Sequence, residues 1–210
     1  MKRRPEKFRA VLFDLDGVLI HSERYWFLLF NQALEQFGHR PISRVKFRQH
    51  WGQSTAEDIR IFMPERTLAE VRQYFTRHQS DFAAHFRMAT LALKVLAGLR
   101  HRRMKLACVT NSHRRIARME LIITGLRRHF PVLITADDVR RPKPAPDMLR
   151  AACRRLDVRL DQALFVGDTS TDEQAARRAG CRFIGYRYPS RTSIRSLSRL
   201  FSIVDRGLPD

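Results

Sequence analysis

Short apolar runs that each stop at a polar turn are the feature that most constrains how this chain can fold. The runs lie at 9–13, 105–110, 132–135 and 163–166, with a weaker one at 182–185. Runs of this length, with no alternation of apolar and polar residues, are typical of strands that are buried on both faces. They predict a sheet in the interior of an α/β protein.

Helical patterns separate these runs near 113–124, 145–156 and 171–179, and Gly180 is placed to end the last of them. Strands that alternate with helices require right-handed crossovers, so we expect a parallel sheet with helices on both faces. The tail after Ser190 is less regular. There we expect a short helix at 192–200 and a last strand at 202–204.

The segment 20–89 interrupts the alternation, because its patterns are helical throughout. We expect helices at 22–37, 43–49, 54–62 and 68–86. Ser22 is the expected N-cap of the first helix, and Trp26 belongs to a wide apolar face that indicates packing inside the segment. Ser54 and Glu57 have the spacing of a capping box.

This interruption predicts two units. Residues 1–19 and 90–210 form a catalytic core, and residues 20–89 form a helical cap inserted after the first strand. The insertion follows the carboxyl end of a strand, where ligands bind in open α/β sheets.

The charge of the chain raises a separate hypothesis. Its 210 residues carry 40 Lys+Arg against 21 Asp+Glu, a net charge of +19, and the excess lies mostly after residue 90. Either the arginines form a solvated surface, or the protein is a non-catalytic binder of nucleic acid. Neither a zinc-finger spacing nor an RNA-binding aromatic signature is present, so a nucleic-acid partner is not expected.

Cysteine usage and hydropathy indicate the compartment. Three widely spaced cysteines encode no disulfide framework, and no apolar run approaches the length of about 18 residues that suggests a membrane span. The basic start Met1–Arg9 lacks the apolar segment of a secretory signal. We expect a cytoplasmic protein, a monomer or a weak homodimer, with no membrane partner.

Polar residues follow four of the expected strands where each strand ends. They are Asp14 and Asp16, then Thr110, Asn111 and Ser112, then Lys143, and finally Asp168 and Asp172. Because the carboxyl ends of parallel strands meet at one edge of the sheet, we expect these side chains to share one crevice.

These residue types in one crevice point to phosphoryl transfer. Asp14, Asp16 and Asp168 would repel one another unless a hard dication such as Mg²⁺ joined them. Asp14 is then the expected nucleophile toward phosphorus, and Asp16 is the expected acid and base. Lys143 and the Thr110 hydroxyl would bind phosphoryl oxygens.

Four ordered motifs carry a resemblance to the haloacid dehalogenase superfamily. They are Phe13-Asp-Leu-Asp-Gly-Val-Leu, Val109-Thr-Asn-Ser, Lys143-Pro-Ala-Pro-Asp and Val166-Gly-Asp-Thr-Ser-Thr-Asp172. The resemblance implies a Rossmann-like core, a helical cap and an aspartyl-phosphate intermediate. It implies that Asp14 and Asp168 are metal ligands, with the main-chain carbonyl of Asp16. Asp172 corresponds to the second acidic residue of the last motif and is expected to bind metal waters or to orient Lys143.

Asp16 favours a branch of this superfamily that acts on phosphate esters, because dehalogenases and phosphonate-cleaving members lack that acid. We therefore predict a Mg²⁺-dependent phosphatase acting on a small phosphorylated metabolite such as a sugar phosphate or phosphoglycolate. A sugar-phosphate mutase of the β-phosphoglucomutase type is the alternative, although no arginine directly follows Gly52-Gln53-Ser54.

Substrate contacts are expected from both units. Thr110, Asn111 and Lys143 would serve the phosphate. His21, Gly52, Gln53 and Ser54 are the candidates on the cap, and Trp51 is equally compatible with cap packing.

Overall fold

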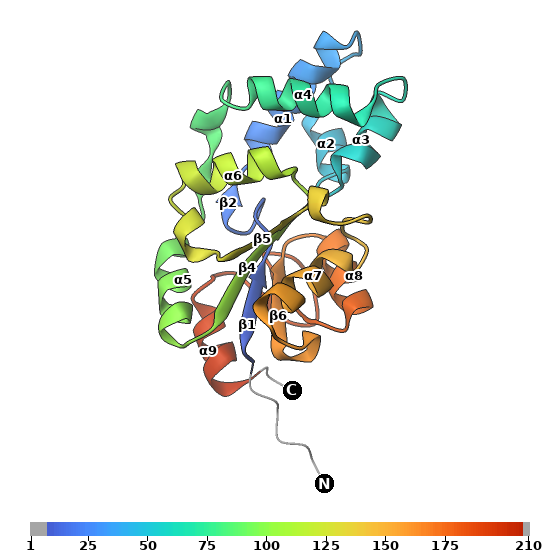
Figure 1. Ribbon diagram of the computed structural model, residues 1–210. Coiled ribbons are helices and arrows are strands. Elements are labelled where there is room, and N and C mark those ends of the chain that lie inside the picture. The colour runs from blue at the N-terminus through green and yellow to red at the C-terminus, as the bar shows by residue number, and fades with distance from the viewer. Residues whose placement is uncertain (1–7, 208–210) are drawn as a thin grey trace.

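A six-stranded parallel sheet forms the centre of the protein (Figure 1). The computed structural model describes residues 8–207, so most of the basic start Met1–Arg9 lies outside the described residues. The strands are β1 (Ala10–Phe13), β4 (Lys105–Thr110), β5 (Val132–Thr135), β6 (Ala163–Gly167), β7 (Arg182–Tyr186) and β8 (Ser193–Ile194), in the order β5-β4-β1-β6-β7-β8. Strand β1 pairs with β4 on one side and β6 on the other. The predicted parallel α/β fold is confirmed.

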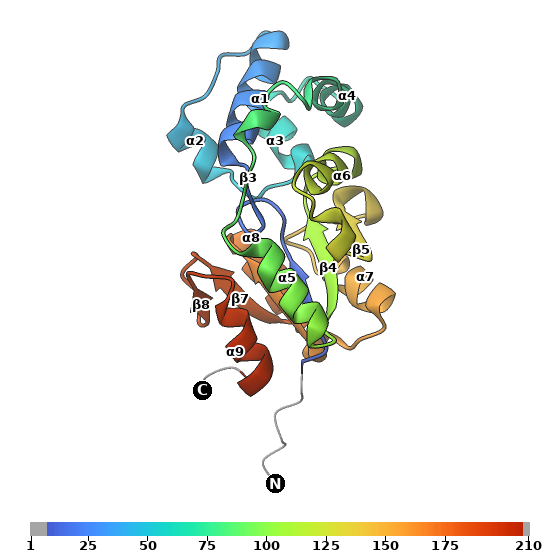
Figure 2. The same ribbon diagram turned by 90° about the vertical axis from the view of Figure 1, so that its left-hand side faces the viewer.

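Helices cover both faces of this sheet. They are α5 (Ala92–His101), α6 (Arg114–Ile123) and α9 (Arg199–Arg206) on one face, and α7 (Asp147–Leu156) and α8 (Ser170–Ala179) on the other, as Figures 1 and 2 show. Helix α5 has no counterpart among the predicted helices. Short 3-10 turns lie at Arg127–His129, Ala136–Asp138 and Leu160–Gln162.

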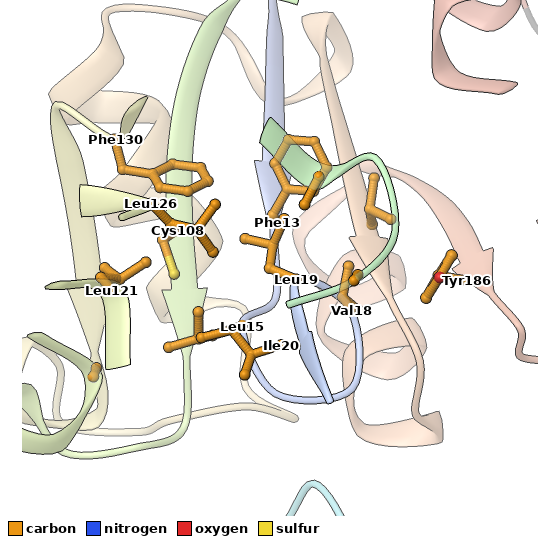
Figure 3. Close-up of a cluster of buried hydrophobic side chains, with 14 of the residues drawn as sticks. Phe13, Leu15, Val18, Leu19, Ile20, Cys108, Leu121, Leu126, Phe130 and Tyr186 are labelled. Atoms are coloured by element: carbon orange, nitrogen blue, oxygen red, sulfur yellow. The ribbon is translucent and has the colours of Figure 1, made fainter. Parts of the chain in front are cut away.

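Alternate residues of β1 supply the two apolar layers. Val11 and Phe13 belong to one buried cluster, whereas Ala10 and Leu12 belong to the other. Figure 3 shows Phe13 in the first cluster, near Phe130, with their ring centroids 6.1 Å apart. Because β1 is buried on both faces, the backbone that leads into Asp14 is held rigidly.

The segment between β1 and β4 is mainly helical and lies beyond the carboxyl ends of the central strands (Figure 1). We call residues 22–86 the helical insert. It contains α1 (Glu23–Gln36), α2 (Arg44–Gln49), α3 (Thr55–Phe62), α4 (Leu68–His78) and a 3-10 turn at Ala83–His85. The expected capping box of Ser54 and Glu57 begins α3.

Two expectations for this segment are wrong. The residues flanking the insert are extended: β2 (Ile20–His21) and β3 (Arg87–Met88) pair as an antiparallel ribbon, so the segment 20–89 is not helical throughout. The last helix also ends at His78 instead of residue 86. The Tyr25 hydroxyl donates a hydrogen bond to the main-chain oxygen of Gln79 at 3.0 Å, which satisfies that carbonyl where the helix stops.

The prediction for the tail is also wrong, since a strand comes first and a helix follows. Residues 193–194 form β8, and α9 occupies the region where a strand was expected. Leu200, Ile203 and Val204 are buried, at the i, i+3, i+4 spacing of a helix that packs on α5. Among residues 8–207, no helix has both the length and the apolar character needed to cross a membrane.

One acidic residue is buried inside the core. Glu120, on α6, is fully buried, and its carboxyl oxygens have no hydrogen-bond partner among the described residues. Burial, followed by the negative charges of Asp16 and Asp14, raises the pKa of Glu120 well above its ordinary value of 4.5. The folded protein therefore holds this carboxyl protonated at pH values where the unfolded chain ionises it.

This difference makes stability depend on pH. Between pH 4.5 and the raised pKa, the folded state binds the extra proton, so the free energy of unfolding falls as pH rises. We therefore expect the stability of Glu120→Gln, measured relative to the parent protein, to rise by about 1 kcal/mol or more as the pH increases from 4 to 7. Urea unfolding in EDTA measures this gain. Glu35→Gln, at an exposed position on α1, is the control. If the free energy of unfolding depended on pH in the same way for the parent protein and for Glu120→Gln, the prediction would be wrong.

Candidate active site

The polar residues singled out in the sequence do meet at one edge of the sheet. Asp14 directly follows β1, and its main-chain N–H donates to the Val166 carbonyl of β6 at 2.9 Å. Thr110 ends β4, Lys143 lies between β5 and α7, and Asp168 directly follows β6. The strand order β4-β1-β6 places Asp14 at the middle of this edge.

Lys143 joins the buried carboxylates of the site. Its side chain is 2% exposed, and its ammonium group donates to Asp14 Oδ1 at 2.8 Å, Asp172 Oδ1 at 2.7 Å and the Val109 carbonyl at 3.2 Å. Burial alone would lower the pKa of Lys143, but Asp14 and Asp172 outweigh it and raise the pKa. The lysine therefore stays charged inside the protein.

Asp14, Asp168 and Asp172 form an acidic cluster. Each offers one carboxylate oxygen, and these oxygens lie within 4.8 Å of one another. Burial, followed by the charge of Asp172, raises the pKa of Asp14 and also that of Asp168. One lysine does not balance this cluster.

The cluster fits a hard dication. Asp168 Oδ1 is buried without a hydrogen-bond partner among the described residues, which is what a missing ligand leaves behind. Asp172 has no comparable free oxygen. Its Oδ1 accepts from Lys143, and its Oδ2 accepts from the Thr169 hydroxyl at 2.6 Å and from the main-chain N–H groups of Asp168 and Thr169. Asp14 and Asp168 are therefore the carboxylates best placed to hold a hard dication.

The Asp16 side chain stands apart from the metal cluster, because four donors occupy it. Its Oδ1 accepts from the Ser22 hydroxyl at 2.5 Å and the Trp26 indole at 2.9 Å. Its Oδ2 accepts from the Ser112 hydroxyl at 2.9 Å and the Thr110 hydroxyl at 3.4 Å. These bonds fix the orientation of the carboxyl group.

Two of these donors correct the sequence interpretation. Ser22 occupies the N-cap position of α1 but makes no side-chain capping bond, since its hydroxyl is bound to Asp16. Trp26 does pack within the insert, against Phe75, yet its N–H reaches Asp16. Ser22 and Trp26 lie four residues apart at the start of a helix, so they share one face, and that spacing was the available signal.

Asn111 connects the core with the insert. Its side-chain oxygen accepts from the Lys143 main-chain N–H at 3.0 Å, and its Nδ2 donates to the Lys143 carbonyl at 2.9 Å and to the Gly52 carbonyl at 3.0 Å. Nearby, the Trp51 indole donates to Asp168 Oδ2 at 3.2 Å. The loop at 51–53 is thus bonded directly to the edge of the sheet that holds the acidic cluster.

Gly17 is required by the close approach of Asp168. Its φ of +82° is a conformation that side chains disfavour, and a Cβ atom there would lie 2.0 Å from Asp168 Oδ2. The glycine that follows Asp16 therefore leaves space for a carboxylate from another strand.

A pocket of about 80 Å³ lies between the sheet edge and the insert. Asp14, Asp16, Thr110, Asn111, Ser112 and Lys143 line it from the core, and Trp51, Gly52 and Gln53 line it from the insert. Two expected substrate contacts are not among the lining residues. His21, on β2, lines a separate hollow with Arg187, and Ser54 is buried in the capping box.

The chain matches known proteins over most of its length. Residues 11–186 match the haloacid dehalogenase-like hydrolase family. The chain is 32% identical over 186 residues to a phosphoglycolate phosphatase of Cupriavidus necator, covering 85% of this chain and 80% of that protein. It is 30% identical over 176 residues to the pyrophosphatase PpaX of Bacillus pumilus, covering 84% and 82%.

A solved structure shares the fold. The crystal structure of a predicted phosphoglycolate phosphatase from Haemophilus somnus superposes with a TM-score of 0.81 at 22% identity, covering 93% of this chain and 97% of that one. The parallel sheet, its acidic edge and these relatives define the class, a hydrolase of the phosphatase type. The chain belongs to the haloacid dehalogenase-like hydrolase family.

The buried ion pairs of Lys143 predict a large loss of stability when this lysine is replaced. Lys143→Met would leave Asp14 and Asp172 buried without their cation, so we expect the free energy of unfolding to fall by about 3–5 kcal/mol near pH 7. Urea unfolding without added metal measures the change. Lys46→Met, at an exposed position on α2, should change stability by less than about 0.5 kcal/mol, and equal effects of the two substitutions would contradict the prediction.

Proposed function

We propose that the protein is a Mg²⁺-dependent phosphatase that hydrolyses a small phosphate monoester through an aspartyl-phosphate on Asp14. The observation that carries this proposal is the position of Asp14, which is hydrogen-bonded to Lys143 and lies beside the carboxylate of Asp168, one oxygen of which is buried without a partner among the described residues. The family match and the named phosphatase relatives support the same chemistry.

Asp14 and Asp168, with the main-chain carbonyl of Asp16, are the proposed ligands of Mg²⁺. The ion would neutralise the carboxylates and polarise the phosphoryl oxygens. Asp172 has a positioning role in this scheme, because both of its oxygens are engaged in holding Lys143 and the residues at the start of α8.

The chain's own residues carry the two chemical steps. In the first, Asp14 attacks phosphorus while the bond from phosphorus to the ester oxygen breaks, and Asp16 gives its proton to that oxygen. In the second, Asp16 takes a proton from water, which attacks the phosphoryl group and releases phosphate and free Asp14. Lys143 and Thr110 offset the charge that develops on the phosphoryl oxygens.

The proposed cap consists of the helical insert together with its flanking strands β2 and β3. We retain residues 1–19 and 90–210 as the catalytic core and residues 20–89 as the cap. The hydrogen bonds from Asn111 to Gly52 and from Trp51 to Asp168 support this role, since they hold the insert over the site and restrict the entry of water.

The three buried free cysteines are in keeping with a cytoplasmic setting, which we also propose.

The pocket favours a phosphatase over the mutase alternative. A mutase must also hold the second phosphate of a bisphosphate. Among the residues that line the pocket, Lys143 is the only lysine or arginine, and it is committed to Asp14 and Asp172.

A panel of phosphate monoesters tests the proposal. We expect phosphate release to require Mg²⁺, to stop in EDTA, and to fall by about a thousandfold or more in Asp14→Asn, which lacks the nucleophile. Asp157→Asn, at an exposed position that follows α7, is the matched control and should retain parent activity. Undiminished turnover by Asp14→Asn would exclude the aspartyl-phosphate route.

A further inference from the structure

Aromatic rings dominate the part of the pocket that the insert contributes. The lining includes Trp26, Phe30, Phe47, Trp51, Phe62 and Phe75, which come from all four helices and from the loop before α3. The ring centroids of Phe47 and Trp51 lie 5.8 Å apart, and those of Phe30 and Phe62 lie 5.5 Å apart. The faces of such rings carry partial negative charge and attract cations.

One carboxyl group lies among these rings. Asp58, on α3, lines the same pocket, and its side chain makes no hydrogen bond or ion pair in the described part of the chain. Burial, followed by the charge of Glu57, raises the pKa of Asp58 to about 7. The neighbouring Glu57 accepts hydrogen bonds from the main-chain N–H and the hydroxyl of Ser54 at the start of α3, and it adds a second negative charge beside Asp58. Within residues 8–207, Asp58 is thus an acid that lacks a cationic partner.

The insert contributes no lysine or arginine to the lining of the pocket. Its one imidazole in the lining, His50, packs edge to face on the Phe62 ring, and Lys143 serves the phosphate end from the core. An anionic leaving group would therefore meet ring faces and an acid, with no lysine or arginine to compensate its charge. A cationic leaving group would meet partners of the opposite sign.

On the basis of the proposed phosphatase function, we infer that the substrate is the phosphate monoester of an amino alcohol, whose ammonium group lies between the aromatic rings and pairs with Asp58. The phosphate occupies the end formed by Asp14 and Lys143. The pocket thus matches a small zwitterion, anionic at the core and cationic at the insert.

This inference predicts a substrate that differs in charge from the substrates in the names of the relatives. Phosphoglycolate carries a carboxylate beyond its ester bond, and pyrophosphate carries a second phosphate. Both place negative charge where this pocket has Asp58. We therefore expect phosphoglycolate and pyrophosphate to be poor substrates.

Matched esters provide the test. Phosphocholine and 3,3-dimethylbutyl phosphate have nearly the same shape and differ in the charge of the terminal group. We expect kcat/KM for phosphocholine to exceed that for the neutral ester by about tenfold or more, mainly through a lower KM. In Asp58→Asn this ratio should fall toward one. Glu35→Gln, an exposed acid of the insert, should keep the parent ratio.

Several outcomes overturn the inference. A ratio near one in the parent protein would do so, as would an unchanged ratio in Asp58→Asn. A preference for phosphoglycolate would indicate an anion site, and a preference for nucleoside monophosphates would indicate stacking of a neutral base.

A binding measurement separates this inference from the proposed function. Calorimetry of Asp14→Asn with Mg²⁺ and each of the two matched esters needs no turnover. Preferential binding of phosphocholine supports the ammonium site even if no ester is hydrolysed, an outcome that would overturn the phosphatase proposal alone. Hydrolysis of p-nitrophenyl phosphate without preference for phosphocholine, in turnover or in binding, supports the phosphatase and overturns the ammonium site.

Discussion

The buried ion pairs of Lys143 are the interaction on which the site depends. Three segments distant in sequence, ending in Asp14, Lys143 and Asp172, converge on one ammonium group that is almost inaccessible to water. Desolvating such charges costs several kcal/mol per ion, and only good geometry offsets that cost. The strand β1 and the two hydrogen bonds between the Asn111 side chain and the Lys143 backbone provide that geometry. The lysine thus holds the Asp14 and Asp172 carboxylates in place.

The charge of the whole chain contrasts with the charge of its pocket. The net charge is +19, yet the residues lining the pocket include Asp14, Asp16 and Asp58 against one lysine. Some surface arginines pair with carboxylates of their own, as Arg102 does with Asp205 and Arg141 with Asp147. For the proposed substrates, the basic excess would act at long range by attracting anionic esters, whereas selection of the leaving group would occur at short range within the pocket.

The sequence predicted the parts of the molecule that depend on local pattern. Apolar runs predicted the central strands, and polar residues at their ends predicted which side chains share a crevice. Local pattern could not show that the Ser22 hydroxyl reaches Asp16 instead of capping α1, because that bond depends on how the insert sits over the sheet. The turn after His78 and the helix α9 were missed for a related reason, since Tyr25 and α5 stabilise them from distant positions. The sequence did not indicate a functional role for Asp58, because an acidic residue near the start of an amphipathic helix ordinarily faces solvent.

The hydrogen bonds of Asp16 have a consequence for how such enzymes diversify. Two of its four donors, Ser22 and Trp26, belong to the insert, and two, Thr110 and Ser112, belong to the core. In the proposed mechanism, the segment that contributes the aromatic part of the pocket would thus also orient the acid that protonates the leaving group. Exchanging the insert for that of a relative would replace half of the acid's surroundings along with the specificity pocket. If Asp16 has the proposed role, substrate choice and proton transfer would therefore change together.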